Sequence, residues 1–349
     1  MPILFQNIID IENIEYSYNK CMLGKSKYKK DAIIFDIDKT QNINNLIEDL
    51  SINKYYPGKY NEFIIYEPKK RVIHAPTFRD KLVQRMVYNV MAPIYKNIFI
   101  KDSYACIIGK GTHAASQKTQ DMIKKAKWQY GDNAYIIKID IEKFFYSIKR
   151  DILKKIYRKK ITCKKTLHLL DLIIDSAPGE IGLPLGNITS HTFANIMLNE
   201  LDQYCKRYLA IKYYIRYMDD VCIVVKDKGK AQQLLHLCEE YSNNVLELNL
   251  NKNKSKIFPI SQGVNFVGFK TWGTHKLLRV SSKRKIKNRA RKIPNLIKCG
   301  KITIEKAEQM LNSWFGHAKH GNNYNFMKAI LKKYTYIQVR ENKLKLEGL

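Results

Sequence analysis

The sequence lacks the usual features of a disulfide-bonded or membrane-spanning protein. Its seven cysteines are scattered without a Cys-x-x-Cys pair, which argues against a disulfide scaffold and a zinc ribbon. Cys299, His317 and His320 match no ordinary zinc spacing, and a fourth ligand is missing. No signal peptide opens the chain, and no apolar run approaches membrane-spanning length. We therefore expect a soluble, cytoplasmic protein with no membrane partner.

Acidic residues are also scarce. The 349 residues include 32 Asp and Glu against 62 Lys and Arg, a formal net charge of +30. Such charge is unusual for an enzyme of small metabolites, and phosphate backbones are its natural counterion. A lysine-rich surface in a compositionally biased genome would give the same balance, so charge alone leaves nucleic-acid binding open. Residues 271–349 carry 19 Lys and Arg against 4 Asp and Glu, half of the excess.

Hydrophobic periodicity predicts a mixed helix and strand protein. We expect strands at 135–139 and 263–270, with hairpins at 63–73 (around a Glu-Pro-Lys-Lys turn) and 212–226. We expect helices at 79–95, 152–174, 190–209 and 231–247, and basic helical structure from about 275. Residues 1–60 show short helical patterns, typical of an N-terminal extension.

Acidic residues stand at two unusual places. Asp140 ends the apolar strand YIIKI, and Asp219 and Asp220 occupy the break between two β-rich runs. In a strand buried on both faces, acids are expected only where the chain emerges. If these strands are neighbours, three carboxylates meet at one rim and need cations, for which Mg²⁺ is suited. The alternative is that Asp219 and Asp220 only form a polar turn.

Further motifs favour the first interpretation. Tyr217-Met218-Asp219-Asp220 resembles the YxDD box of reverse transcriptases, and KIDIEKFFYSI at 138–148 resembles their first catalytic block. Four other blocks follow the family's order over residues 63–270: RVIHAPTFRDKLVQ at 71–84, GLPLGNITSH at 182–191, LNLNKNKSKI at 248–257 and VNFVGFK at 264–270. The last of these resembles the primer-gripping hairpin. The tetrapeptide alone is a weak signal, whereas six ordered blocks are a strong one.

The resemblance implies roles for individual residues. Asp140, Asp219 and Asp220, with the backbone carbonyl of Ile141, would hold two Mg²⁺ ions, for which Mn²⁺ can substitute. Lys254 would assist departure of pyrophosphate, and Phe145 would lie under the sugar of the incoming nucleotide and exclude a 2′-hydroxyl. The other implied nucleotide-binding residues are Arg71, Arg79, Leu185 and Gly186. The implied template–primer contacts are Tyr217, Phe266, Gly268, Lys283, Arg284, Lys287 and Arg291.

The implied fold is a right-hand polymerase of the α/β (α+β) class, with an antiparallel sheet in the palm. We expect an N-terminal extension at 1–62, fingers at 63–134, a palm at 135–262 with finger insertions around 150–190, and a primer grip with a basic helical thumb at 263–349. The implied activity is RNA-directed DNA synthesis. Its partners would be an RNA template, a DNA or RNA primer and dNTPs.

Details of the loop at 182–191 suggest a branch of the family. Most members carry Gln-Gly where this chain has Leu185-Gly186; LPLGNxTSx resembles reverse transcriptases of diversity-generating retroelements. DSYACIIGKGTHAA at 102–115 and SWFGHAKHG at 313–321 resemble the same branch, but His191 replaces its usual Gln. That branch implies a cognate non-coding RNA and a small basic accessory protein. Because Leu185 packs where Gln would hydrogen-bond, we expect low fidelity.

Alternatives remain at this point. Related enzymes of anti-phage defence and group II intron-like reverse transcriptases share these blocks. An RNA-synthesising polymerase would use the same acids, and Phe145 is the residue that discriminates against it. A non-catalytic RNA-binding protein with a decayed polymerase fold is disfavoured by the complete set of acids.

Overall fold

The computed structural model describes residues 3–66 and 69–348. The chain forms two compact units, each assembled from three stretches. The first contains Met1–Ile107, Ile139–Lys212 and Leu235–Lys254, and the second contains Ile108–Lys138, Tyr213–Leu234 and Ser255–Leu349. Both units mix helices with strands, and antiparallel strand pairs occur in both. The predicted fold class is therefore confirmed. Among the described residues, no helix is both long and apolar enough to cross a membrane.

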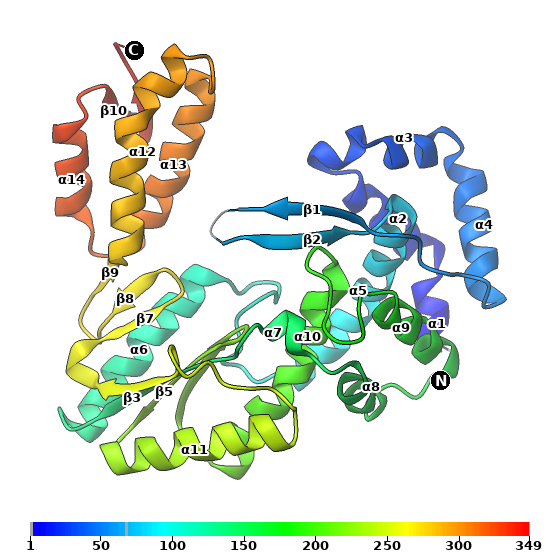
Figure 1. Cartoon of the computed structure of the whole chain (residues 1–349), viewed down its shortest axis with the longest axis horizontal. Helices are drawn as coiled ribbons and strands as arrows, with labels where there is room; N and C mark the ends of the chain where they lie inside the picture. The colour runs from blue at the N-terminus through cyan, green and yellow to red at the C-terminus, as the bar shows by residue number, and fades with distance from the viewer. Residues whose placement is uncertain (1–2, 67–68, 349) are drawn as a thin grey trace. The chain divides into compact units, whose positions relative to one another are not determined.

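The first unit begins with the short helices predicted for residues 1–60. They are α1 (Ile3–Ile8), α2 (Ile11–Cys21), η1 (Gly24–Tyr28), α3 (Lys30–Ile37) and α4 (Lys39–Ser51). The side chain of Asp10 caps α2 by accepting hydrogen bonds from the N–H groups of Glu12 and Asn13. Helices α1 and α2 pack on α5 (Phe78–Ile98), which contains the predicted helix at 79–95 (Figure 1). These contacts join the N-terminal helices to the rest of the unit.

A two-stranded ribbon also belongs to this unit. Strands β1 (Asn61–Ile65) and β2 (Arg71–Ala75) pair antiparallel, as Figure 1 shows, and Phe63 lies opposite Ile73. The predicted hairpin is therefore confirmed. The part of its predicted turn at Glu67 and Pro68 lies outside the described residues.

The helix predicted for 152–174 is wrong in one respect, because two helices occupy this stretch. They are α8 (Arg150–Arg158) and α9 (Lys164–Asp175). The segment between them contains Ile161 and Thr162. These two β-branched residues disfavour a continuous helix. The short α7 (Phe144–Ser147) precedes them. The helix predicted at 190–209 is α10 (Ile188–Gln203), continued by the π-helical turn η2 (Tyr204–Tyr208).

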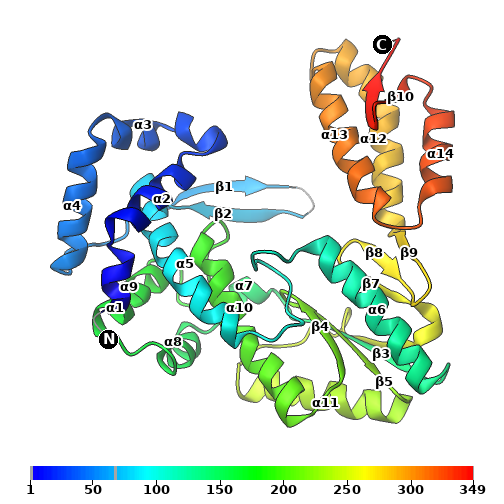
Figure 2. The same ribbon diagram turned by 180° about the vertical axis from the view of Figure 1, so that it is seen from behind.

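The second unit is built around a four-stranded sheet with the order β4-β5-β3-β6. The strands are β3 (Tyr135–Asp140), β4 (Tyr213–Tyr217), β5 (Asp220–Val225) and β6 (Lys256–Pro259). Helix α6 (Thr112–Tyr130) packs across β4 and β5 (Figure 2). The predicted strand at 135–139 and hairpin at 212–226 are confirmed, and the helix predicted at 231–247 is α11 (Lys228–Asn244).

Residues 263–270 were expected to form a short strand from their pattern and a hairpin from their resemblance to the primer grip, and the hairpin is confirmed. They contribute to a hairpin of β7 (Val264–Phe266) and β8 (Phe269–Thr271), to which β9 (Lys276–Leu278) adds a third strand. Val267 and Gly268 form the two-residue turn, both with positive φ (39° and 93°). This backbone matches the twist of a tight antiparallel hairpin, although a β-branched residue rarely adopts it.

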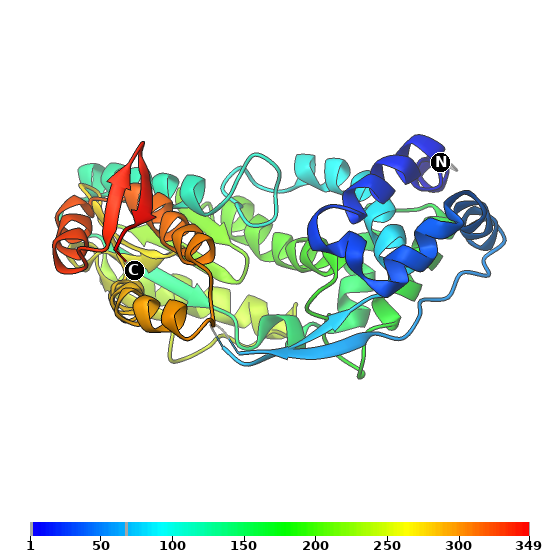
Figure 3. The ribbon, with the colours of Figure 1, turned by 90° about the horizontal axis from the view of Figure 1, so that it is seen from above.

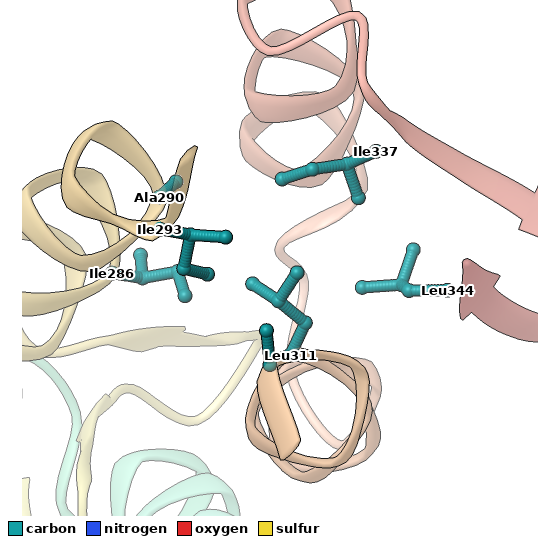
Figure 4. Close-up of a cluster of buried hydrophobic side chains, with 7 residues drawn as sticks. Ile286, Ala290, Ile293, Leu311, Ile337 and Leu344 are labelled. Carbon is teal, nitrogen blue, oxygen red and sulfur yellow. The ribbon is translucent and has the colours of Figure 1, made fainter. Parts of the chain in front are cut away.

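The C-terminal part is helical, as predicted, with α12 (Val280–Lys298), α13 (Ile304–Lys319) and α14 (Tyr324–Lys333). It ends in an unpredicted hairpin of β10 (Ile337–Arg340) and β11 (Lys343–Leu346), and β11 packs on α13 (Figure 3). One buried cluster joins α12, α13, β10 and β11 (Figure 4): Ile286, Ala290, Ile293, Ala307, Leu311, Ile337 and Leu344. This small core orients the surface of α12.

Candidate active site

The acidic pair predicted between two strands forms the turn of the β4–β5 hairpin. Tyr217 pairs with Asp220, so Met218 and Asp219 are the two residues of the loop. Met218 has a φ of 55°, a left-handed conformation that costs energy in a residue other than glycine. The fully buried Arg216 donates a hydrogen bond to the carbonyl oxygen of Met218 at 3.1 Å. The buried guanidinium of Arg216 thus stabilises the conformation of the turn.

Asp220 is held by a lysine outside the predicted set of site residues. The Nζ of Lys138 lies 3.1 Å from Oδ1 of Asp220, and the two side chains are 15% and 24% exposed. The same ammonium donates to the carbonyl oxygen of Asn265 at 3.1 Å. Side chains alternate along a strand, so Lys138, two residues before Asp140, lies on the same face of β3 as Asp140. This spacing was the sequence signal that Lys138 belongs to the site. Burial lowers the pKa of the nearby Arg279, an effect that Asp220 opposes.

Asp140 and Lys254, predicted from separate motifs, are in direct contact. The Nζ of Lys254 lies 2.7 Å from Oδ1 and 2.8 Å from Oδ2 of the carboxylate. The Asp140 side chain is 8% exposed, whereas that of Lys254 is 46% exposed. The backbone holds the two together, because the N–H of Asn251 donates to the carbonyl oxygen of Asp140 and Ile141 bridges to Leu250. Ile141 itself is buried.

The loop that precedes α10 lies against the β1–β2 hairpin. The N–H of His74 in β2 donates to the carbonyl oxygen of Leu185 at 2.8 Å. Gly186 has a φ of 126°, and a Cβ there would approach the carbonyl oxygen of His74 to 2.7 Å. A side chain would therefore be both strained and excluded by backbone. The Leu185 side chain is 8% exposed, which fits the packing role expected for it.

The two arginines predicted near the triphosphate differ in their surroundings. Arg71 is exposed at the first position of β2. Arg79 forms an ion pair with Asp49 at 2.6 Å and lies over the ring of Tyr55, 4.8 Å from its centroid. These contacts hold Arg79 against the N-terminal helices. Its role toward a nucleotide stays a prediction.

Apart from Tyr217, which ends β4, the predicted template–primer residues lie in the β7–β8 hairpin and on α12. In the β7–β8 hairpin, Phe266 is fully buried, whereas Gly268 is in the turn, where an added Cβ would meet His317 at 3.2 Å. On α12, Ile286, Ala290 and Ile293 are buried. Residues three or four apart share a helix face. Arg284, Lys287 and Arg291 therefore form one exposed basic face, and Lys283 is half-buried over Phe326.

The donor chemistry at Asp140 fits a divalent cation. Both oxygens of this nearly buried carboxylate bind a cation, the Lys254 ammonium, because an unpaired charge would be costly there. Within 3–66 and 69–348, no group of three or more His, Cys, Asp or Glu side chains forms a ready-made metal cage, including Cys299, His317 and His320. Mg²⁺ is usually bound by one or two carboxylates together with substrate phosphates and needs no such cage.

An acidic hairpin turn, a strand-end aspartate and a basic helical region agree with the class expected from the sequence, the palm-type polymerases of nucleic acids. Residues 59–271 match the family model described as "Reverse transcriptase (RNA-dependent DNA polymerase)". This match covers more than half of the chain. The chain therefore belongs to the reverse transcriptase family, whose fold is the right-hand polymerase fold.

Curated relatives agree with the family assignment. The chain is 27% identical over 268 residues to Protein YkfC of Escherichia coli K12, a match that covers 63% of this chain and 67% of YkfC. It is 23% identical to the group II intron-encoded protein LtrA of Lactococcus lactis, over 79% of this chain and 58% of LtrA. It is 26% identical to the retron Ec73 reverse transcriptase of E. coli, over 78% of this chain and 85% of that protein. The chain thus spans only part of the length of YkfC and LtrA.

Solved structures include a telomerase of Candida albicans in complex with a fragment of telomeric RNA. It aligns with a TM-score of 0.48 and 12% identity, over 84% of this chain and 58% of that chain. The assignment to the family rests on the match to residues 59–271 and on the curated relatives.

Proposed function

We propose that this chain is an RNA-directed DNA polymerase that extends a DNA or RNA primer along an RNA template with dNTPs. The observation that carries the proposal is the tight acidic turn at 217–220, which lies between paired strands inside the region that matches the family. Met218 adopts a left-handed conformation, and the buried Arg216 donates to its carbonyl oxygen, so the backbone that carries the two carboxylates is fixed. Strain of this kind is concentrated at functional sites.

In this proposal Asp140, Asp219 and Asp220, with the carbonyl of Ile141, hold two Mg²⁺ ions, for which Mn²⁺ can substitute. Strand β3 ends at Asp140, and Asp219 and Asp220 lie at the turn between β4 and β5. When bound, such ions activate the primer 3′-hydroxyl and stabilise the leaving pyrophosphate. Lys254 neutralises the Asp140 carboxylate before substrate arrives and then assists the pyrophosphate. Its partly exposed side chain leaves it free to shift between these anions.

The remaining residues position the substrates. Phe145 contacts the sugar and excludes ribonucleotides, while Arg71 and the loop at 185–186 face the incoming nucleotide. Tyr217, the turn at Gly268 and the exposed basic face of α12 bind the template–primer duplex. Because Phe266 is fully buried, its contribution is to support the hairpin from below. The proposed subdomains are the fingers at 63–134, the palm at 135–262 and the primer grip with thumb at 263–349.

For the biological role, we propose a low-fidelity enzyme of a diversity-generating retroelement that acts with a cognate RNA and a small basic accessory protein. The apolar Leu185 in LPLGNxTSx supports this proposal. The second candidate is a reverse transcriptase of anti-phage defence or of a group II intron-like element. The similarity to LtrA and to the retron Ec73 enzyme supports this second candidate.

The proposal is tested by incubating the purified protein with Mg²⁺, a mixed-sequence RNA template, an annealed primer and dNTPs, followed by sequencing of the products. Template-directed extension supports the polymerase. Errors concentrated opposite template adenines would favour the diversity-generating role, and even errors, or DNA made without added template, would favour the second candidate. Absence of extension at low and moderate salt, with template–primer binding intact and with the cognate RNA and accessory protein supplied, would contradict the proposal.

A further inference from the structure

His191, the residue that departs from the diversity-generating pattern, contacts Phe145. It lies in the first turn of α10, where its ring centroid is 5.4 Å from that of Phe145 and the two planes meet at 81°. This is an edge-to-face arrangement, the geometry that aromatic pairs prefer. His191 thus packs directly on Phe145, the residue proposed to contact the sugar.

The backbone beneath Phe145 is already fixed. The N–H of Leu183 donates to the carbonyl oxygen of Phe145 at 2.7 Å. Gly182 lies so close that an added Cβ would come within 3.0 Å of the same oxygen. The remaining freedom of Phe145 is the rotation of its side chain about χ1 and χ2. Its rotamers are restricted by the backbone and by neighbouring side chains, and among the described residues His191 and Phe144 are the two rings in contact with it.

The state of the imidazole suits a packing role. Burial lowers the pKa of His191 below its ordinary value, which favours the neutral ring. Its Nδ1 is buried and has no hydrogen-bond partner among the described residues. The ring is therefore not held in place by a hydrogen bond through Nδ1. The edge-to-face contact with Phe145 is the specific interaction that orients the His191 ring.

We propose that His191 is a positioning residue that sets the sugar selectivity of the enzyme by holding the ring of Phe145 in one rotamer. This inference rests on the proposed function, in which Phe145 excludes the 2′-hydroxyl. A ring free to rotate leaves space for that hydroxyl during part of its motion. Loss of His191 would then admit ribonucleotides without removing the gate itself.

The test compares single-nucleotide incorporation of dNTP and rNTP on an RNA template, with kcat/KM measured for each. The variants are Phe145→Ala, His191→Ala, His191→Gln, His191→Phe and the double Phe145→Ala/His191→Ala. His236→Ala is the matched control, because His236 is an exposed histidine that pairs with Glu240. Thermal melting of each variant separates misfolding from a change in selectivity, and His191→Gln keeps similar volume if the alanine variant folds poorly.

His191→Ala and His191→Gln are expected to lower the ratio of dNTP to rNTP kcat/KM by about two- to tenfold, the range of an aromatic pair interaction. His191→Phe is expected to restore most of the ratio, and the double variant should resemble Phe145→Ala alone. A changed ratio for Phe145→Ala with an unchanged ratio for His191→Ala and His191→Gln would overturn the inference and leave the proposed function standing. An unchanged ratio for Phe145→Ala would remove the sugar gate and the inference together.

Discussion

The ammonium group of Lys254 contacts both carboxylate oxygens of Asp140, at 2.7 and 2.8 Å. The carboxylate ends the central strand β3 and is nearly buried, whereas the lysine comes from a segment more than a hundred positions later in the chain and is about half exposed. Two residues that the sequence assigns to separate motifs thus form one charge pair. The pair gives the strand-end carboxylate a cation in the absence of substrate.

Removal of the ammonium group should slow catalysis. We expect Lys254→Ala to lower kcat for primer extension by about a hundredfold, the size of a typical acid–base contribution, because Lys254 is proposed to assist the leaving pyrophosphate. The comparison is Lys252→Ala, which removes an exposed lysine two residues away. Single-turnover kinetics separates this effect from substrate binding. Equal rates for the two variants would show that Lys254 only balances charge.

The apolar side chain of Leu185 should determine fidelity. Leu185→Gln supplies the polar group that most relatives carry, and we expect it to lower the misincorporation rate by roughly tenfold. Leu185→Met keeps the apolar packing of this nearly buried position and should leave the error rate unchanged. Sequencing of cDNA made from a defined RNA template measures both. An error rate for Leu185→Gln equal to that of the wild type would remove the explanation of low fidelity.

The exposed face of α12 should account for part of the salt dependence of template–primer binding. Neutralising Arg284, Lys287 and Arg291 together should reduce the slope of log K against log salt by about two to three, roughly one for each phosphate that the helix no longer neutralises. The matched control neutralises Lys285, Arg289 and Lys292, which carry the same charge on another exposed face of the same helix. Fluorescence anisotropy over a salt series gives the slopes. Equal changes in both triple variants would point to unspecific attraction.

Much of the fold followed from the sequence, because its strands are short apolar runs bounded by polar breaks. The strand end at Asp140 and the acidic hairpin turn are confirmed on this basis. Helix α6 was not predicted, since its buried stripe includes small or polar residues such as Ala115, Ser116 and Thr119. The β10–β11 hairpin had a signal, the alternation of Lys and Leu at 343–346, that is easily missed beside basic helices.

The site was predictable only in part. Motifs identify Asp140 and Lys254, but not their direct contact, which depends on the pairing of Ile141 with Leu250. The only sequence signal for the ion pair of Lys138 with Asp220 was the alternation of side chains along β3, which puts Lys138 on the same face as Asp140. The turn at Val267 lacks the Asn-Gly or Asp-Gly signal of a tight hairpin, so the residue pattern alone indicates a short strand there. Only the resemblance of residues 264–270 to the primer grip indicated the hairpin.

The most direct test of the account is primer extension by Asp219→Asn on an RNA template with dNTPs and Mg²⁺. The matched control is Asp227→Asn. Asparagine keeps the side-chain oxygen that accepts a hydrogen bond from the N–H of Lys230 at the start of α11. We predict that Asp219→Asn lowers the extension rate by about a thousandfold, equivalent to about 4 kcal/mol of lost transition-state stabilisation. Its melting temperature and template–primer affinity should stay near those of the control. Wild-type extension by a folded Asp219→Asn protein would contradict catalysis at the acidic turn.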